Sequence, residues 1–307
     1  MTPRAALATY GKLTLMALFW GGTFIGGRIA AGEMTPAAAA LWRYVIGIVL
    51  LVAAAYVLEG GLPRLSARQW LGVVLLGATG VVLFNLCFMY ALARVPASRA
   101  SLIMALNPAV TLIAAAIFLH EHLTRSKVLG IAIALAGVAV VLGHGNPANL
   151  FSGSVGIGEI VMFGCPLAWT ANTLVAKRML GNVSAIGQTA FGSIAGALML
   201  VAMLAFQGEL ALPHVSARVW GALVFLGIFG TAIALVLFYD GVRRIGAARA
   251  SVFINLVPVF AVLLGVLVLH EALETSMLVG GALVIGGILL LNRPAAPATA
   301  GARTHAA

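Results

Sequence analysis

Several aromatic and polar side chains occur inside otherwise apolar stretches of this sequence, where they could bind a small molecule. Trp20 and Trp169 lie in the stretches WGGTF and WTANT, each followed by small or polar residues. An indole ring can stack on a flat or apolar ligand while its N–H donates a hydrogen bond. Tryptophan in a membrane-spanning helix usually lies near the interfaces, so two such residues near mid-span favour the walls of one shared cavity. The alternative is that each ring packs against small residues of a neighbouring helix.

Arg43 places a cation within an apolar stretch. It lies seven residues after Pro36, which puts it roughly 10 Å into a spanning helix at about 1.5 Å per residue. A cation at that depth costs about 2.5–3.5 kcal/mol on an insertion scale unless it is paired. The side chain could bind the carboxylate of an amino acid or a similar substrate. A structural role, with hydrogen bonds to carbonyl groups, is the alternative.

Amides and prolines within the apolar stretches complete the set of candidates. Asn107 directly precedes Pro108, and Asn255 lies three residues before Pro258. Interhelical hydrogen bonding, worth about 0.6 kcal/mol on average, is the alternative to ligand binding for each amide. A proline frees a backbone carbonyl and kinks its helix, which provides an acceptor for an ammonium group or a bend for a gate. The candidate substrate-binding residues are Trp20, Thr23, Arg43, Tyr44, Asn85, Met89, Asn107, Trp169, Asn172, Tyr239 and Asn255, and the candidate gating residues are Pro108 and Pro258.

The sequence does not predict catalytic or metal chemistry. His120, Glu121 and His122 lack the i, i+4 histidine spacing that places two metal ligands on one helix face, and a helix-end cap explains them better. No Ser, His and Asp set occurs at one depth of the apolar stretches. We therefore expect no cofactor and no metal, and a membrane enzyme is a less favoured alternative.

The composition defines the class of element that must position these side chains. The chain has 62% hydrophobic and 8% charged residues with a mean hydropathy of +1.10, whereas a soluble domain carries about 25% charged residues. It is therefore expected to be a polytopic membrane protein. The net charge of +10 comes from basic residues spread between apolar stretches, which fits the positive-inside rule better than nucleic-acid binding.

An internal duplication organises the chain. The stretch from Arg99 to Leu123 returns 150 residues later as Arg249 to Leu273, with nine of 25 aligned positions identical. Repetition at a fixed offset indicates two related units. Each copy is an apolar stretch interrupted by a proline, which is long enough to span a bilayer as a helix.

Charged, proline and glycine clusters divide the chain into ten apolar segments, five in each half. We predict an all-α protein with a first repeat over 1–145, a linker over 146–155, a second repeat over 156–292 and a disordered cytoplasmic tail over 293–307. The predicted spans are 13–31, 36–58, 69–92, 98–119, 127–144, 157–180, 184–206, 218–242, 248–269 and 275–292.

The distribution of basic residues predicts the orientation. With a cytoplasmic N-terminus, thirteen of the 18 Lys and Arg residues lie in cytoplasmic segments and four in external ones. The positive-inside rule therefore places both termini in the cytoplasm. An odd number of spans in each half makes the two copies antiparallel, so the duplication is an inverted repeat, an arrangement that transporters use to place a substrate near the membrane midplane.

These features resemble the drug/metabolite transporter superfamily, EamA type. The matching residues are Trp20-Gly21 and Trp169 in the repeat-first helices, Pro36 with Arg43 in the second helix, Pro108 and Pro258 in the fourth helices, and Glu121 and Glu271 at their ends. Length and helix pattern look most like the YddG-type amino-acid exporters. The resemblance implies a bacterial inner-membrane exporter of small metabolites. Arg43 has no basic counterpart in the second half, where Ser193 aligns with it, so any role of Arg43 is asymmetric.

The predicted function is export of small amphipathic metabolites by alternating access, with large apolar or aromatic amino acids as the leading substrates. The expected partners are the substrate and the lipid bilayer, without nucleic acid, and the protein is expected to be a monomer. Glu159 and Asp240 are the acids closest to the spans, and neither has a partner acid that would form a proton relay. We therefore predict facilitative transport. A proton-coupled drug or metabolite carrier, or a channel, is the alternative.

Overall fold

The computed structural model describes residues 3–119, 123–151, 155–212 and 214–291. Within these ranges the regular structure is helical, with nine helices long and apolar enough to cross a membrane and a shorter apolar helix at Thr275–Leu291. The expected ten-span, all-α architecture is thereby confirmed. The predictions for His120, Glu121, His122 and the tail over 293–307 concern residues outside the described ranges.

Five spans make up each half of the chain, and several of them consist of two or three helical segments. The first half contains α1 (Pro3–Ala30), α2 (Pro36–Glu59), α3 (Ala67–Leu76) continued by η1 (Gly77–Leu83) and α4 (Phe84–Leu92), α5 (Ala97–Met104) followed by α6 (Asn107–Leu119), and α7 (Arg125–Leu142). After η2 (Pro147–Phe151), the second half contains α8 (Ile157–Met162) with α9 (Gly164–Met179), α10 (Ala185–Gln207), α11 (Ala217–Phe225) with η3 (Leu226–Ile233) and α12 (Ala234–Ile245), α13 (Ala247–Val252) with η4 (Phe253–Leu256) and α14 (Val257–Leu269), and α15 (Thr275–Leu291).

The helix starts follow from capping chemistry that recurs in both halves. The Ser66 side chain accepts a hydrogen bond from the third backbone N–H of α3, and Ser216 does the same at the start of α11. A serine in this position satisfies one of the backbone donors that a helix start leaves free. Helix α1 begins at Pro3, ten residues before the predicted span, because hydropathy marks only the apolar part of a longer helix.

The third span of each half is interrupted by a π-helical segment, η1 in the first half and η3 in the second. A π segment widens the helix and leaves backbone carbonyls without their usual partners. Side-chain donors bind these free carbonyls: Thr231 Oγ1 donates to Leu226 O at 2.9 Å, and Asn85 Nδ2 donates to Val81 O at 2.8 Å. Hydropathy does not distinguish a π segment from an α-helix, so a single uninterrupted span was the expectation in both places.

The fourth span of each half changes geometry just before its proline. Helix α5 ends at Met104 and α6 begins at Asn107, so that Pro108 is the second residue of α6. In the second half the 3-10 segment η4 separates α13 from α14, and Pro258 is the second residue of α14. Proline has no backbone N–H to donate, so it fits at the start of a helical segment.

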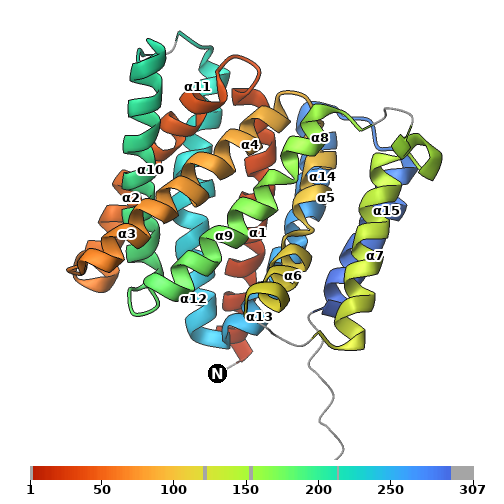
Figure 1. Ribbon diagram of the computed structural model, residues 1–307, viewed down its shortest axis with the longest axis horizontal. Coiled ribbons are helices and arrows are strands. Elements are labelled where there is room, and N and C mark those ends of the chain that lie inside the picture. The colour runs from red at the N-terminus through yellow and green to blue at the C-terminus, as the bar shows by residue number, and fades with distance from the viewer. Residues whose placement is uncertain (1–2, 120–122, 152–154, 213, 292–307) are drawn as a thin grey trace, which may run out of the picture.

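Helices from the two halves pair across the molecule. Helix α1 packs on α11, η3, α12 and α14, whereas α9 packs on α3, η1, α4 and α6. Helices α7 and α15 lie side by side at one edge (Figure 1), so close that a Cβ added at Gly137 would lie only 2.6 Å from Gly280 O. Such close backbone approach is typical of glycine-lined membrane helix pairs.

Successive spans alternate in direction, so their ends lie at two faces of the molecule. We call the face where α1 begins the N face and the other face the opposite face.

Candidate functional site

Four side chains from three spans form a buried polar cluster, the Arg43 cluster, which consists of Arg43, Tyr44, Asn85 and Thr231. Arg43 is 8% exposed, and its Nε donates to Thr231 Oγ1 of η3 at 3.0 Å. Its Nη1 donates to Asn85 Oδ1 of α4 at 3.1 Å, and Asn85 Nδ2 donates to the Tyr44 hydroxyl at 3.2 Å. The cluster therefore joins α2, α4 and η3, and it unites three of the predicted site residues with Thr231, which the sequence did not single out.

The charge of Arg43 is held by neutral groups. In the part of the chain that the structure describes, no carboxylate forms an ion pair with Arg43, and the guanidinium carbon lies 5.6 Å from the centre of the Tyr44 ring. Buried cations in membrane proteins usually pair with acids or mark a substrate pathway. The hydrogen bonds of the cluster hold three spans together, and its positive charge can attract an anionic group.

Trp20 and Thr23 lie next to the Arg43 cluster. Trp20 Nε1 donates to Gly230 O at 3.2 Å, and Gly230 directly precedes Thr231 of the cluster. Thr23 Oγ1 donates to Trp20 O at 2.6 Å, so the threonine hydroxyl serves its own helix. The Trp20 ring packs on Phe238 with 5.6 Å between ring centroids. The segment η3 therefore contacts both the tryptophan and the arginine that the sequence predicted.

Trp169 is more accessible than Trp20. It is 39% exposed and contacts the Phe84 ring at 5.8 Å. Among the described residues its indole N–H has no hydrogen-bond partner, whereas Asn172 in the same helix donates to Leu76 O at 3.2 Å and to Thr79 Oγ1 at 3.4 Å. Asn172 therefore connects α9 to the start of η1, and the Trp169 ring remains free to contact a ligand or lipid.

The two tryptophan helices contact the π segments in the same way. Thr23 of α1 touches Gly230 of η3, where an added Cβ would lie 2.5 Å from Thr23 Cγ2. Asn172 of α9 touches Gly80 of η1 at the equivalent place, with its side-chain amide next to the Cβ position of Gly80. Glycine is required at both places because the partner helix comes too close for a side chain. The spacing of 150 residues between the two glycines is the signal that sequence analysis missed.

Two amides next to the helix interruptions have buried atoms without partners. Asn255 is 9% exposed and its Nδ2 is a donor without an acceptor, while Asn107 Oδ1 is a buried acceptor without a donor, within the described residues. An unpaired buried polar group costs about 1–3 kcal/mol. Such atoms are therefore suited to bind a ligand, and they lie beside Pro258 and Pro108 respectively. Neither amide shares a hydrogen bond with the Arg43 cluster.

Met89 and Tyr239, two further candidates, lie in surroundings that differ from each other. Met89 is fully buried in the main core, close to Gly27 of α1. It therefore contributes to packing rather than to a cavity wall. Tyr239 packs on Phe238 at 5.6 Å and contacts Thr189 of α10, which places it nearer the N face than the Arg43 cluster.

The acids closest to the spans are paired with cations. Asp240 accepts from Lys12 at 2.9 Å and from Arg244 at 3.0 Å. Glu159 is 7% exposed and pairs with Arg99 at 3.3 Å. Arg243 and Arg244 follow Asp240 in the same helix, so sequence spacing suffices to bring them near it, whereas Lys12 and Arg99 come from distant helices that spacing could not identify.

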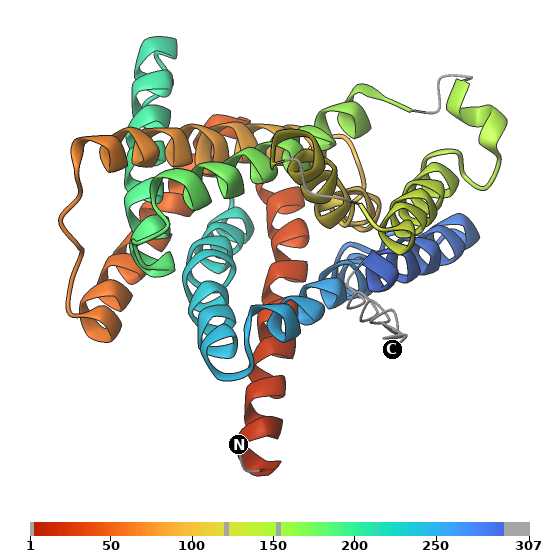
Figure 2. The same cartoon turned by 60° about the horizontal axis from the view of Figure 1, so that its bottom comes forward.

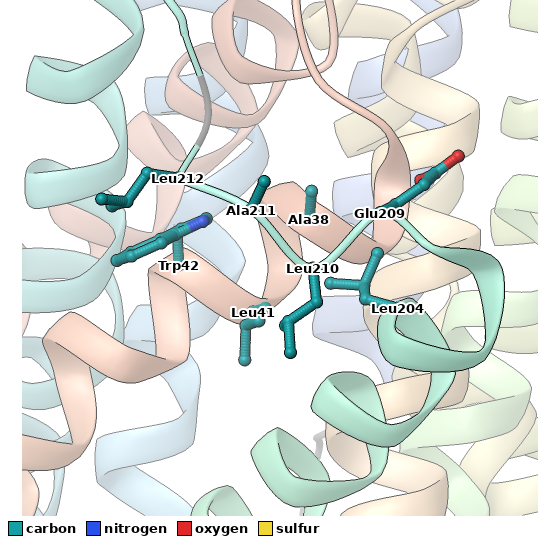
Figure 3. Close-up of a pocket in the computed structure, with 8 residues that line it drawn as sticks. All are labelled: Ala38, Leu41, Trp42, Leu204, Glu209, Leu210, Ala211 and Leu212. Carbon is teal, nitrogen blue, oxygen red and sulfur yellow. The ribbon is translucent and has the colours of Figure 1, made fainter.

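A surface cavity of about 230 Å³ lies between α2 and α10 near the opposite face. Figure 3 shows Trp42 and the leucines Leu41, Leu204, Leu210 and Leu212 around it, while the Glu209 carboxylate points away from it. None of the predicted site residues lines this cavity, and its walls are mainly apolar. We therefore assign the candidate site to the Arg43 cluster and its neighbours.

Comparison with known proteins identifies related sequences over nearly the full chain. The profile described as EamA-like transporter family matches twice, over residues 10–143 and 156–293. A crystal structure with 22% sequence identity has a TM-score of 0.65 and covers 91% of this chain and 96% of its own.

Curated relatives carry transporter names. An uncharacterized transporter of Archaeoglobus fulgidus is 30% identical, covering 92% of this chain and 97% of its own, and the uncharacterized transporter YyaM of Bacillus subtilis is 27% identical over 92% and 93%. A protein of Streptantibioticus cattleyicolor named as a probable terminal-alkyne amino-acid exporter is 29% identical, covering 92% of each chain.

Proposed function

We propose, because this chain belongs to the EamA-like transporter family, that it exports small amphipathic metabolites bearing a carboxylate. The family match and the helical architecture make the chain a multi-pass membrane transporter. Large apolar or aromatic amino acids are the leading substrates, and the transport cycle is alternating access.

The observation that carries this proposal is the Arg43 cluster. A buried guanidinium surrounded by Thr231, Asn85 and Tyr44 has hydrogen-bonded neighbours but no counter-charge among the described residues. Charge-assisted hydrogen bonds between arginine and a carboxylate are short and strong. An amino-acid carboxylate therefore supplies the counter-charge that the protein itself does not provide.

Aromatic and amide groups support the rest of an amino-acid substrate. The exposed Trp169 ring offers a surface for a large apolar side chain. Asn107 Oδ1 is an acceptor suited to an ammonium group, and Asn255 Nδ2 is a further donor suited to a carboxylate. The name of the Streptantibioticus relative points to the same class of substrate, and the YddG-type subtype stays a prediction.

The proposed orientation places the N face in the cytoplasm of a bacterium, with the protein in the inner membrane as a monomer. Most of the described basic residues lie on the N face, among them Arg64, Arg125, Lys177 and Arg243. The positive-inside rule favours this orientation. Labelling of single cysteines at Lys177 and Arg218 with an impermeant maleimide tests it, because only the Arg218 position is expected to react from outside.

The proposed energy source is the gradient of the substrate itself. Asp240 and Glu159 both have cationic partners, so neither is a free carboxylate that would carry a proton through the membrane. Liposome uptake of a labelled amino acid is measured with and without a pH gradient at zero membrane potential. Accumulation that follows the pH gradient, and is lost in Asp240→Asn or Glu159→Gln, would support the proton-coupled alternative instead.

Counterflow in liposomes tests the substrate class. Purified protein is reconstituted with an internal panel of unlabelled amino acids, and exchange with external labelled phenylalanine or leucine is followed. We expect exchange with apolar and aromatic amino acids and at least tenfold weaker exchange with their carboxamide analogues, which lack the carboxylate. Equal exchange of acids and carboxamides would contradict the role of Arg43, and flux in excess of about 10³ s⁻¹ without counterflow would indicate a channel.

A further inference from the structure

We infer that Arg28 and Glu271 form a clamp that holds the transporter closed at the opposite face. The clamp acts on the turn between α4 and α5, from Leu92 to Ser98, and we call Arg28 and Glu271 the turn clamp. The inference rests on the alternating-access cycle proposed above. It concerns the gate of that cycle, and it does not depend on which substrate is carried.

Arg28 binds the carbonyl end of α4. Its Nη1 donates to Leu92 O, the last residue of α4, and to Val95 O in the turn at 3.1 Å. A helix C-terminus carries partial negative charge on its free carbonyls. The cation at the end of α1 therefore binds the turn through both charge and hydrogen bonds.

Glu271 binds the amide end of α5. Its Oε1 accepts from Ala97 N at 2.7 Å, and its Oε2 accepts from Ser98 N at 3.0 Å and from Ser98 Oγ at 2.6 Å. A helix N-terminus attracts an anion for the same reason that a C-terminus attracts a cation. Glu271 follows directly after α14 and its left-handed residue His270, so the carboxylate ties the end of the ninth span to the start of the fourth.

The clamp closes over a region of direct helix contact. Gly27 of α1 lies against Leu92 and Phe88 of α4, and a Cβ at Gly265 of α14 would lie 3.6 Å from Ser98 Cβ. Phe24 and Phe88 contact each other with 5.1 Å between ring centroids. In this part of the opposite face, both apolar packing and the turn clamp therefore hold α1 and α14 against the α4–α5 turn.

At the N face, the corresponding turn lies between α12 and α13, and among the described residues it receives no contact of the Arg28 kind; Glu121, the counterpart of Glu271, lies outside the described ranges. Alignment of Trp20 with Trp169 pairs Arg28 with Lys177, which is exposed and forms no hydrogen bond or ion pair within the described ranges. Its neighbour Arg178 donates to Phe118 O of α6 at 3.3 Å, away from that turn. Figure 2 shows α12 and the N-terminal half of α1 extending away from α3 and α9. Within the described residues, the contacts of the turn clamp are therefore found at the opposite face.

Distances between spin labels test the clamp without any transport measurement. In a variant with Cys87 and Cys165 replaced by alanine, one label pair at Ala93 and Ala272 reports on the opposite face. A second pair at Lys177 and Arg243 reports on the N face. All four positions are exposed. The full chain is measured in nanodiscs without substrate.

We expect Glu271→Gln and Arg28→Gln to lengthen the distance at the opposite face and to shorten it at the N face. The ratio of open to closed conformers at the opposite face should rise about tenfold, because charge-assisted hydrogen bonds are the strong class. Ser98→Ala, which removes one of the three bonds to Glu271, should give a smaller change in the same direction. This variant keeps the inference testable if a charge change impairs folding.

Two nearby charges serve as controls. Arg94 lies on the same turn but donates to Tyr90 O of its own helix, and Glu274 lies in the same loop as Glu271 but bonds to His144 and Ser276. Arg94→Gln and Glu274→Gln should leave both distances unchanged. Unchanged distances in Glu271→Gln and Ser98→Ala, or equal changes in the controls, would overturn the clamp. Because no substrate is present, counterflow by the parent protein tests the proposed function separately.

Discussion

The two halves of the molecule repeat one set of contacts and differ in another. Thr23 on Gly230 in one half and Asn172 on Gly80 in the other form the same contact between a first helix and a π segment. The Arg43 cluster has no such counterpart. At the positions 150 residues away, Arg43, Asn85 and Thr231 correspond to Ser193, Leu235 and Val81.

This difference separates the demands of the fold from those of the ligand. An inverted repeat must pack its helices in the same way on both sides, so the close glycine contacts occur twice. The proposed substrate, a small metabolite with one carboxylate, has no internal symmetry, so one charged anchor would be enough for it. We therefore attribute packing to the repeated contacts and propose that the unrepeated cluster recognises the substrate.

Replacement of Arg43 is the strongest test of this assignment. Arg43→Met removes the charge and two hydrogen bonds to Thr231 and Asn85. We expect kcat/KM for carboxylate substrates to fall about 100-fold, since hydrogen bonds to charged groups contribute about 1.5–3 kcal/mol each. Transport in liposomes is compared with thermal unfolding of the same sample.

The matched control is Ser193→Ala at the corresponding position in the second half. This serine is 1% exposed, so the variant tests a buried site without charge and should transport normally. Arg43→Lys keeps the charge and should retain part of the activity. If Arg43→Met transports as the parent does, or if its loss of activity only follows its loss of stability, the cluster is structural.

Replacement of the contact glycines by alanine should lower the stability of the protein by a similar amount in both halves. Gly230→Ala places a methyl group 2.5 Å from Thr23 Cγ2, and overpacking of this kind costs about 1–3 kcal/mol. Gly80→Ala should cost a similar amount through its contact with Asn172. The melting temperature of the purified protein measures both effects.

Rescue by a smaller partner distinguishes this contact from a general glycine requirement. Thr23→Ser removes Cγ2 but keeps the hydroxyl that donates to Trp20 O, so Gly230→Ala with Thr23→Ser should recover most of the lost stability. Asn172→Ser should rescue Gly80→Ala in the same way. A large loss in one half alone would show that the repeat symmetry does not extend to these helices.

Sequence reasoning identified the elements because membrane helices leave strong local signals. Apolar length located the ten spans, and the duplication indicated their antiparallel arrangement. Arg43 and Asn85 could also be chosen as candidates from the sequence, because a polar side chain in a long apolar stretch needs a partner inside the protein. Trp20 contacts η3 whereas Trp169 contacts Phe84 of α4, so a shared cavity between the two rings stays a prediction, and Met89 lies in the core.

The partners of these residues could not be predicted because they depend on contacts between distant spans. Thr231 lies in LGIFGTAI, an unremarkable apolar stretch, and becomes a partner of Arg43 only because η3 widens beside α2. The pairing of Glu271 with Ser98 likewise joins residues 173 positions apart. Hydropathy and motif spacing describe one helix at a time and carry no information on such pairs.

The amide of Asn172 allows a finer comparison of the two docking contacts. Asn172 donates to Leu76 O and to Thr79 Oγ1, whereas its counterpart Thr23 bonds within its own helix. In a double-mutant cycle, Asn172→Ala and Thr79→Ala should show a coupling of about 0.6 kcal/mol, the average for interhelical hydrogen bonds in membranes. Coupling between Thr23→Ala and Thr79→Ala should be absent, and an equal value would contradict the assigned contact.

The smallest expected difference between the two halves is in stability, and it comes from the loops that contact the starts of the third spans. At the opposite face Glu33 accepts from Ser216 N at 2.8 Å and from Ser216 Oγ at 2.7 Å, whereas at the N face the neutral Asn182 accepts from Gln69 Nε2 at 2.9 Å. The hydrogen bonds from the Ser216 backbone and side chain hold the pKa of Glu33 below its ordinary value of 4.5.

A lowered pKa in the folded state makes the charged carboxylate a stabilising group. The contribution of the Glu33 carboxylate to the free energy of unfolding is complete at pH values above the pKa of the unfolded state, near 4.5. It is lost as the pH falls through the lower pKa of the folded state. Glu33→Gln should therefore unfold at a slightly lower temperature than the parent at neutral pH, and the difference should shrink under acid conditions. Asn182→Asp introduces a carboxylate at the corresponding loop of the N face and serves as the matched variant. Because Gln69 offers it only an amide donor, its stability should depend less on pH than the Glu33 contact does, and a stronger dependence would show that the charged cap is not specific to the opposite face.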